Sequence, residues 1–151
     1  MSAEIILSVI AIILSIASGL FTWWTFVWTA RRDRRWATLD AYNRLQEQAL
    51  DHLNRYSPSS ARKIAENTRS PEYKELSCYI ARIEHFCVGV NGNIYDKNMI
   101  YELAHGYFDG GLRNRITPII DRKNQCGYDY YSNIHAVYAW MDQKTSKCKK
   151  Q

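Results

Sequence analysis

Cations and tyrosines are the residues of this sequence whose types and spacing suggest binding chemistry. Arg113 and Arg115 follow the glycine pair Gly110-Gly111, and Tyr107 lies shortly before it. Arginine side chains hold phosphate oxygens through paired hydrogen bonds, and tyrosine rings stack on nucleobases. We expect the glycine pair to break the chain and leave backbone N–H groups open to a ligand. The pattern predicts a site for an anionic, aromatic ligand. The alternatives are a solvated helix face and attraction to anionic lipid.

Five further residues complete the predicted ligand-binding site. Lys97, His105 and Arg122 would add outer charges, and Asn91 and Asn93 would read base edges from a turn around Gly92. The predicted site therefore consists of Arg113, Arg115, Tyr107, His105, Asn91, Asn93, Lys97 and Arg122.

Catalytic, metal-binding and redox motifs are the next class to test. The sequence contains no HExxH, Walker or GxSxG motif. Glu84 and His85 are neighbours, and adjacent residues on a helix point to different faces. His85 and Cys87 alone are too few ligands for zinc. We expect no enzyme, no catalytic residue, no metal and no cofactor. The cysteines, expected to be reduced thiols without CxxC spacing, are Cys78, Cys87, Cys126 and Cys148.

A long apolar segment precedes the elements that must position these residues. Residues 5–30 contain no charged side chain, and as a helix they would rise about 39 Å, enough to cross a bilayer core of about 30 Å. The acidic start and the length of the run argue against a cleaved signal peptide. Four arginines follow within residues 31–35, so the positive-inside rule places the N-terminus outside and the following domain in the cytoplasm.

Small and hydroxyl residues of the span lie on one heptad stripe. A period of 3.5 residues predicts a left-handed parallel bundle, because small residues let membrane helices approach closely. A pore lined by hydroxyls is a sharper form of this hypothesis. The alternative is that each hydroxyl bonds to a carbonyl of its own helix and faces lipid. The stripe consists of Ser8, Ala11, Ser15, Ser18, Thr22, Thr25 and Thr29.

The remaining sequence predicts helices throughout. Start signals stand at Ser70-Pro71 and at Asp96, and a bend is expected near Pro118. We expect an all-α protein with a single N-terminal transmembrane helix followed by a small cytoplasmic helical domain. The expected helices cover 36–56, 61–67, 71–90, 97–108, 112–123 and 128–141. The expected parts are an anchor with its basic run over 1–35, a ligand-binding domain over 36–143 and a basic, frayed tail over 144–151.

The segment from Ile80 to Asp96 carries a first resemblance. It looks like a signature that consists of an Ile/Leu-x-x-Glu-aromatic-x-x-x-Gly-Val helix and a short glycine-containing turn. This pattern, with the preceding span and basic run, resembles a group of small bacterial membrane proteins that carry a helical domain of unknown function. The resemblance implies an architecture rather than an activity.

A second resemblance rests on length and layout. The plan of one N-terminal span and a basic helical domain is similar to the small membrane effectors of type III CRISPR defence. That resemblance implies a homotetramer in the bacterial inner membrane that binds cyclic tetra-adenylate. It also implies an antiviral effector that acts on the lipid bilayer.

The function that we expect is therefore a membrane-anchored antiviral effector controlled by a cyclic oligoadenylate. The alternative is a phage-exclusion or structural inner-membrane protein without a small ligand. A third hypothesis, a protein that tethers DNA to the membrane, ranks last because no helix-turn-helix stands out, and we expect no duplex nucleic acid as a partner.

Overall fold

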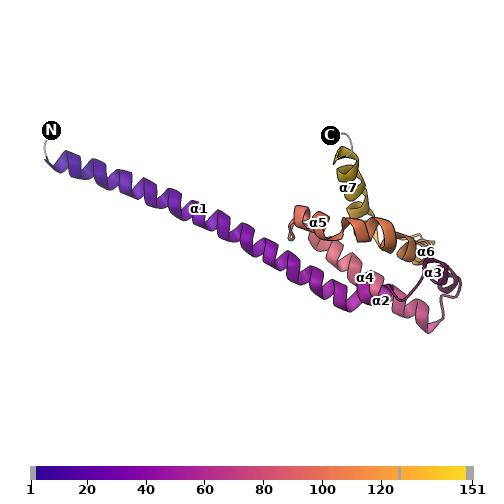
Figure 1. The fold of residues 1–151 in the computed structure, drawn as a ribbon. Coiled ribbons are helices and arrows are strands. Elements are labelled where there is room, and N and C mark those ends of the chain that lie inside the picture. The colour runs from indigo at the N-terminus through magenta and orange to yellow at the C-terminus, as the bar shows by residue number, and fades with distance from the viewer. Residues whose placement is uncertain (1–2, 126, 149–151) are drawn as a thin grey trace. The chain divides into compact units, whose positions relative to one another are not determined.

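The chain folds into helices alone across the part that the structure describes. A computed structural model describes residues 3–125 and 127–148, and Figure 1 shows helices joined by short turns and no strand among these residues. The prediction of an all-α protein with one long apolar N-terminal helix and a helical domain is confirmed. The chain divides into two compact units, residues 1–36 and residues 37–151. Cys126 and the last three residues of the expected tail lie outside the described residues.

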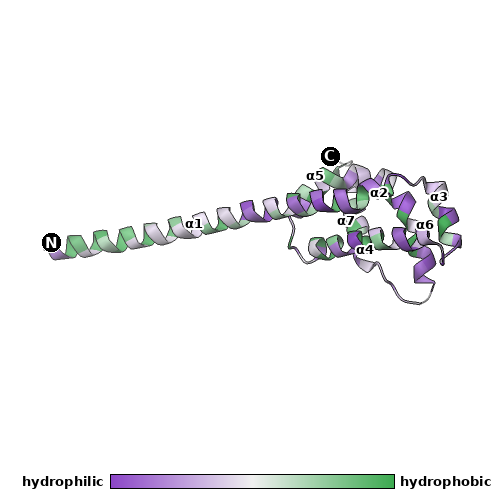
Figure 2. Cartoon of the chain, turned by 90° about the horizontal axis from the view of Figure 1, so that it is seen from below, coloured by the Kyte–Doolittle hydropathy of each residue, from purple (hydrophilic) through white to green (hydrophobic). Residues whose placement is uncertain are grey.

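Helix α1, Ala3–Leu45, contains the apolar segment. Among the described residues it belongs to the one helix that is long and apolar enough to cross a membrane. Figure 2 shows hydrophobic residues along most of its first part. Four of its hydroxyls donate to carbonyls of the same helix at 2.8–2.9 Å, as the alternative for the stripe predicts. A hydroxyl that donates in this way keeps lone pairs that can accept a bond from another helix. These hydroxyls belong to Ser8, Ser15, Thr22 and Thr25.

The helical path continues beyond Leu45 through a wider turn. A π-helical turn, η1, covers Gln46–Leu50, and the short helix α2 covers Asp51–Leu53. In η1 the Asp51 N–H donates to the Gln46 carbonyl five residues earlier, whereas an α-helix joins residues four apart. The turn therefore holds one residue more than an α-helix would.

Helices α3, Pro58–Glu66, and α4, Pro71–Asn91, start in the same way. Ser57 and Ser70 each accept a hydrogen bond from the backbone N–H three residues later, and a proline follows each serine. Such a cap with proline in the first turn starts a helix efficiently. The start predicted for α4 is confirmed. Helix α3 begins earlier than the expected residue 61 because Ser57 and Pro58 supply this start signal.

Helix α5, Lys97–Tyr107, begins after the Asp96 cap as predicted. The expected break at Gly110-Gly111 is wrong. A π-helical turn, η2, Phe108–Leu112, carries the chain directly into helix α6, Arg113–Asn124, which also contains Pro118. Phe108 and Leu112 are fully buried, so packing holds the glycines in a helical path. The glycine pair therefore lies inside a hydrogen-bonded turn and offers no open backbone.

Helix α7, Ser132–Cys148, begins later and ends later than expected. The Lys144 ammonium donates to the Asn98 side chain at 2.8 Å, and the Thr145 and Tyr101 hydroxyls lie 2.9 Å apart. These contacts hold the last turns on α5. Residues 144–148 are therefore helical, and the expectation of a frayed tail is wrong for them.

The core of residues 37–151 lies where α4 packs on α7 and α6 packs on α3. Its members are mostly branched aliphatic side chains that bury their full surface, which is the main stabilising contribution to such a domain. Thr38 is also fully buried, and its hydroxyl accepts the Asp96 N–H at 2.8 Å. The largest fully buried side chains include Ile80, Ile83, Ile100, Phe108, Leu112, Ile116, Ile119 and Ile134.

Candidate functional site

Two residues of the predicted ligand-binding site lie together around Asn54. The Tyr107 hydroxyl and the Arg115 guanidinium both donate to Asn54 Oδ1, at 2.7 and 3.0 Å. Burial raises the pKa of Tyr107, and the charge of Arg115 acts in the opposite direction. Arg115 lies against Gly111, where an added Cβ would come within 3.3 Å of the guanidinium. Tyr107 and Arg115 thus form a polar cluster with the exposed Asn54 that ties α6 and α5 to the end of α2.

Arg113 faces two carboxylates instead of an open surface. Its guanidinium lies 3.4 Å from Asp109 and 3.0 Å from Asp142. The same group lies over the Tyr138 ring, 4.3 Å from its centroid. An arginine between two acids has little net attraction left for a phosphate, so this pairing weakens the case for Arg113 as a ligand contact.

The other predicted site residues are spread over the domain. His105 stacks on Tyr101, with ring centroids 4.6 Å apart. Asn91 ends α4 and donates to the Asn133 backbone and side chain, so its amide is already used. Asn93 follows in the turn with a φ of 57°. Lys97 opens α5, and Arg122 near the end of α6 bonds to Gln125.

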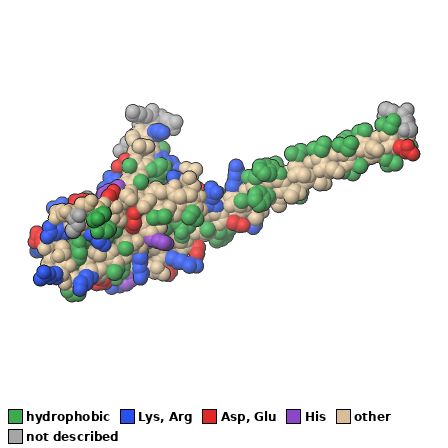
Figure 3. Space-filling model, turned by 180° about the vertical axis from the view of Figure 1, so that it is seen from behind, with side chains coloured by type: hydrophobic (Ala, Val, Ile, Leu, Met, Phe, Trp, Pro, Cys, Tyr) green, Lys and Arg blue, Asp and Glu red, His purple; other side chains and the backbone are tan. Residues whose placement is uncertain are grey.

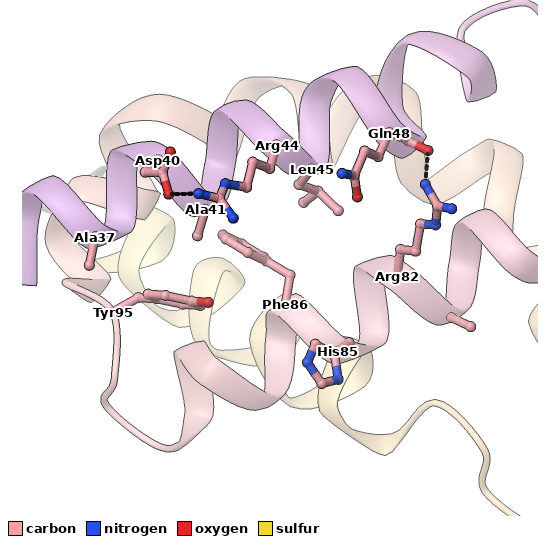
Figure 4. A pocket seen from close by; sticks show the side chains of 11 residues that line it. Ala37, Asp40, Ala41, Arg44, Leu45, Gln48, Arg82, His85, Phe86 and Tyr95 are labelled. Carbon is pink, nitrogen blue, oxygen red and sulfur yellow. Dashed lines mark hydrogen bonds and ion pairs between the residues drawn. The ribbon is translucent and has the colours of Figure 1, made fainter.

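A groove elsewhere in the domain brings aromatic and basic side chains together. It has a volume of about 570 Å³, within the usual range for small-ligand pockets. One wall is the end of α1 with η1, and the other is α4 with the turn after it (Figure 4). We call it the α1–α4 groove. Its lining residues are Ala37, Asp40, Ala41, Arg44, Leu45, Gln48, Ala81, Arg82, His85, Phe86 and Tyr95.

The floor of the α1–α4 groove is apolar and aromatic. The Phe86 and Tyr95 rings are stacked, with centroids 5.3 Å apart and planes 21° from parallel. The Tyr95 ring can lie this close to α4 because Gly89 has no side chain. A Cβ at position 89 would lie 2.3 Å from the ring. Small side chains at Ala37 and Ala41 leave the opposite wall open.

Two arginines and one histidine stand on the rim of the groove. Arg44 pairs with Asp40 at 2.9 Å, and Arg82 donates to the Gln48 carbonyl at 2.9 Å, as Figure 4 shows. The His85 ring completes the rim from α4. With Asp40 opposing Arg44, the two guanidiniums leave a net positive charge. An aromatic floor below a cationic rim suits a ligand that combines an aromatic ring with a phosphate.

None of the groove residues belongs to the predicted ligand-binding site. Its two walls come from residues 37–48 and 81–95, which are separated by two helices in the chain. A helix-periodic pattern shows which face is apolar, but it does not show which faces meet. One feature of the sequence could have indicated the groove. Ala37 and Ala41 are small, and with Arg44 they recur at intervals of three or four residues, so the three lie on the same helix face.

Glu84 has a structural position that the sequence did not suggest. Its carboxylate accepts the backbone N–H groups of Asn133 and Ile134 at 3.1 and 2.9 Å. These residues form the first turn of α7, so Glu84 caps that helix from a distance of about fifty residues along the chain. Within residues 3–125 and 127–148, no three His, Cys, Asp or Glu side chains cluster in a way that could hold a metal ion.

The charged surface is mixed. On the face that Figure 3 shows, Lys and Arg side chains of the domain alternate with Asp and Glu rather than forming one basic patch. This distribution supports a local basic rim as a ligand site more than an extended surface for a polyanion.

Comparison with known proteins adds a family to this description. No curated protein and no solved structure matches the chain. One family model matches residues 11–140, which include most of the apolar segment, the groove and the first half of α7. This match covers most of the sequence, and the chain therefore belongs to the family described as a domain of unknown function (DUF4760).

Proposed function

We propose that this protein is a single-pass protein of the bacterial inner membrane, with its N-terminus outside and its helical domain in the cytoplasm. The charge step after residue 30 supports this orientation. Within residues 3–36, Trp23, Trp24 and Trp28 lie near Arg31, and the Arg32 guanidinium lies 5.7 Å from the centroid of the Trp28 ring. Tryptophan and arginine together are typical of a membrane interface.

The domain, in this proposal, is a receptor for a cyclic oligoadenylate, and cyclic tetra-adenylate is the preferred ligand. The observation that carries the proposal is the α1–α4 groove, in which an aromatic floor lies below Arg44, Arg82 and His85. The partly exposed Tyr95 ring would stack on an adenine, and the arginines would hold the adjacent phosphate. Binding would then change how the protein acts on the membrane, as an antiviral effector does.

A tetramer of this chain would match the four-fold symmetry of the proposed ligand. A ring of four nucleotides has the same rotational symmetry as four identical subunits around one axis. Each subunit would then offer one groove to one adenosine phosphate. The small-residue stripe of α1 supports association of the membrane helices, since small residues allow helices to approach closely in lipid.

A thermal shift of the full chain in lipid nanodiscs tests this proposal. Cyclic di-, tri-, tetra- and hexa-adenylate would be compared with adenosine monophosphate. A ligand present at about 100 times its dissociation constant adds about 2.7 kcal/mol to stability, which is a shift of several degrees for a domain of this size. If none of these nucleotides stabilises the protein at tens of micromolar, the receptor proposal fails.

The second candidate is an exclusion or structural membrane protein without a small ligand. The pairing of Arg113 with Asp109 and Asp142 favours this candidate, because the two carboxylates neutralise a cation that was predicted to bind the ligand. The same shift assay separates the two candidates. A comparison of Arg82→Ala with Arg113→Ala then shows which arginine the ligand contacts, and the groove predicts that only Arg82→Ala weakens binding.

A further inference from the structure

The rim of the α1–α4 groove carries an acid next to one of its two arginines. Asp40 Oδ2 lies 2.9 Å from Arg44 Nη2, and Figure 4 shows this ion pair on the α1 side of the groove. Among the residues that line the groove, all of which lie in the described part of the chain, Asp40 is the one acid. Both side chains are exposed, so a ligand in the groove can reach them. A phosphate on Arg44 would therefore lie close to a carboxylate of the same chain.

Arg82, on the opposite wall, bonds a neutral group. Its guanidinium donates to the Gln48 backbone carbonyl at 2.9 Å, which leaves its positive charge uncompensated. With His85 neutral, the two arginines and one aspartate of the lining give the groove a formal charge of +1. A phosphodiester carries one negative charge, whereas a terminal phosphate carries close to two above pH 7. The charge of the groove therefore matches one phosphodiester.

We propose that Asp40 is a charge filter, a residue that lowers the affinity of the α1–α4 groove for terminal phosphates more than for phosphodiesters. This inference rests on the proposed function, because it requires that Arg44 and Arg82 hold a phosphate. The ligand class that it favours is a nucleotide without a free terminal phosphate, such as a cyclic oligonucleotide. The two arginines alone attract a doubly charged phosphate more strongly than a singly charged one, and Asp40 removes part of that advantage.

The size of the effect follows from the distance between the two anions. Two anions that bind different edges of one guanidinium through bonds of about 2.9 Å lie about 6 Å apart. In water at low ionic strength, repulsion between two unit charges at about this distance lowers an affinity about two- to threefold. A second charge on the phosphate doubles the repulsion energy and so squares this factor, to about five- to tenfold.

A purely structural role for Asp40 would not have this effect. An aspartate four residues before an arginine stabilises an exposed helix slightly. Loss of that stabilisation changes the free energy of unfolding, but it leaves the ratio of the affinities for two ligands of different charge unchanged. This ratio is therefore the quantity that distinguishes a charge filter from a helix-stabilising ion pair.

Equilibrium dialysis with the full chain in nanodiscs of zwitterionic lipid measures the ratio at pH 8 and low ionic strength. The probes are adenosine monophosphate and its phosphate methyl ester, which share base and ribose but carry two and one negative charges. Cyclic tetra-adenylate is measured beside them. Asp40→Asn keeps the size of the side chain and removes its charge. Asp51→Asn removes an exposed charge outside the groove and is the matched control.

The expected result is an unequal gain in affinity. Asp40→Asn should raise the affinity for adenosine monophosphate about five- to tenfold, and the affinity for the methyl ester about two- to threefold. The affinity for cyclic tetra-adenylate should rise at least about twofold, because each phosphate of the ring carries one charge. All gains should shrink at an ionic strength of about 0.15 M, where the Debye length falls to about 8 Å. Asp51→Asn should leave the ratio unchanged.

The outcomes separate this inference from the proposed function. If the mononucleotides bind and Asp40→Asn changes both affinities equally or not at all, the charge filter is wrong and the receptor proposal survives. The same conclusion follows if cyclic tetra-adenylate binds and Asp40→Asn leaves its affinity unchanged. If the mononucleotides show the unequal gain but cyclic tetra-adenylate does not bind, the charge filter stands and the proposed ligand is wrong. If no nucleotide binds to the native chain or to Asp40→Asn at up to about 10 mM, both proposals are wrong.

Discussion

Removal of the Glu84 carboxylate should destabilise the helical domain strongly, although this residue lies outside the apolar core. The carboxylate accepts two backbone N–H groups of the first turn of α7, from Asn133 and Ile134, and also the Asn133 side-chain amide at 2.8 Å. Glu84→Ala leaves all three donors without this acceptor. Glu84→Gln keeps one carbonyl oxygen and loses the charge.

The expected magnitude follows from these contacts. A hydrogen bond to a charged group contributes about 1.5–3 kcal/mol, and the partial exposure of this site favours the lower value. Loss of two backbone bonds should therefore lower the free energy of unfolding by about 3 kcal/mol in Glu84→Ala and by about half of that in Glu84→Gln. For a domain of this size, 3 kcal/mol corresponds to a fall of about 12 °C in Tm.

Thermal unfolding of the full chain in detergent, followed by near-ultraviolet circular dichroism, measures this effect. The near-ultraviolet signal is chosen because it reports packing of the domain rather than helix content of the span. Glu102→Ala on the exposed face of α5 is the matched control and should change Tm by less than about 2 °C. If Glu84→Ala behaves like this control, Glu84 does not stabilise α7 and the description of its cap is wrong.

Three further predictions concern the core, the span and the topology. The buried Tyr138 hydroxyl has no hydrogen-bond partner among the described residues, so Tyr138→Phe should leave stability unchanged or raise it by up to about 1 kcal/mol in urea unfolding at pH 7. Burial raises the pKa of Tyr138, so above about pH 10 the unfolded chain loses the phenol proton before the folded chain does, and stability falls as the pH rises. Tyr138→Phe should reduce this alkaline loss of stability. Ser15→Leu with Thr22→Leu should weaken self-association in analytical ultracentrifugation, whereas Ile13→Leu with Leu20→Ile, off the stripe, should not. A reporter fused to the C-terminus should be active only in the cytoplasm, and periplasmic activity would refute the topology.

Local signals in the sequence were sufficient to predict the starts of α4 and α5. Ser70 followed by Pro71, and Asp96 before Lys97, act through side chains that cap the backbone within three residues. Such interactions depend only on neighbours in the chain, so the sequence contains everything needed to predict them. The same holds for the apolar span, whose length and lack of charge are visible without a structure.

Interactions between distant segments were not predictable in this way. The glycine pair at 110–111 is typical of a break, yet burial of Phe108 and Leu112 keeps the chain helical there. The Glu84 cap joins residues about fifty positions apart, and it starts α7 at Ser132 rather than near residue 128. Tertiary packing overrides local preference in both cases.

In the candidate site, too, residue types can be predicted from the sequence, whereas contacts between distant segments cannot. The sequence shows a basic domain in which cations and tyrosines alternate, but it does not show which arginines face acids. Arg113 lies between Asp109 and Asp142, whereas Arg82 bonds only a backbone carbonyl among the contacts of the groove. Pairing of this kind depends on how α6, α4 and α7 meet, which no single-helix pattern contains.

Isothermal titration of cyclic tetra-adenylate into the full chain in nanodiscs tests the central claim most directly. The α1–α4 groove predicts saturable binding by the native chain and at least tenfold weaker binding by Arg82→Ala, because one charge-assisted contact to a phosphate is lost. Lys74→Ala, which removes an exposed cation of the same helix outside the groove, should bind as the native chain does. Absence of binding by the native chain at tens of micromolar, or equal affinity of the native chain and Arg82→Ala, would contradict the claim.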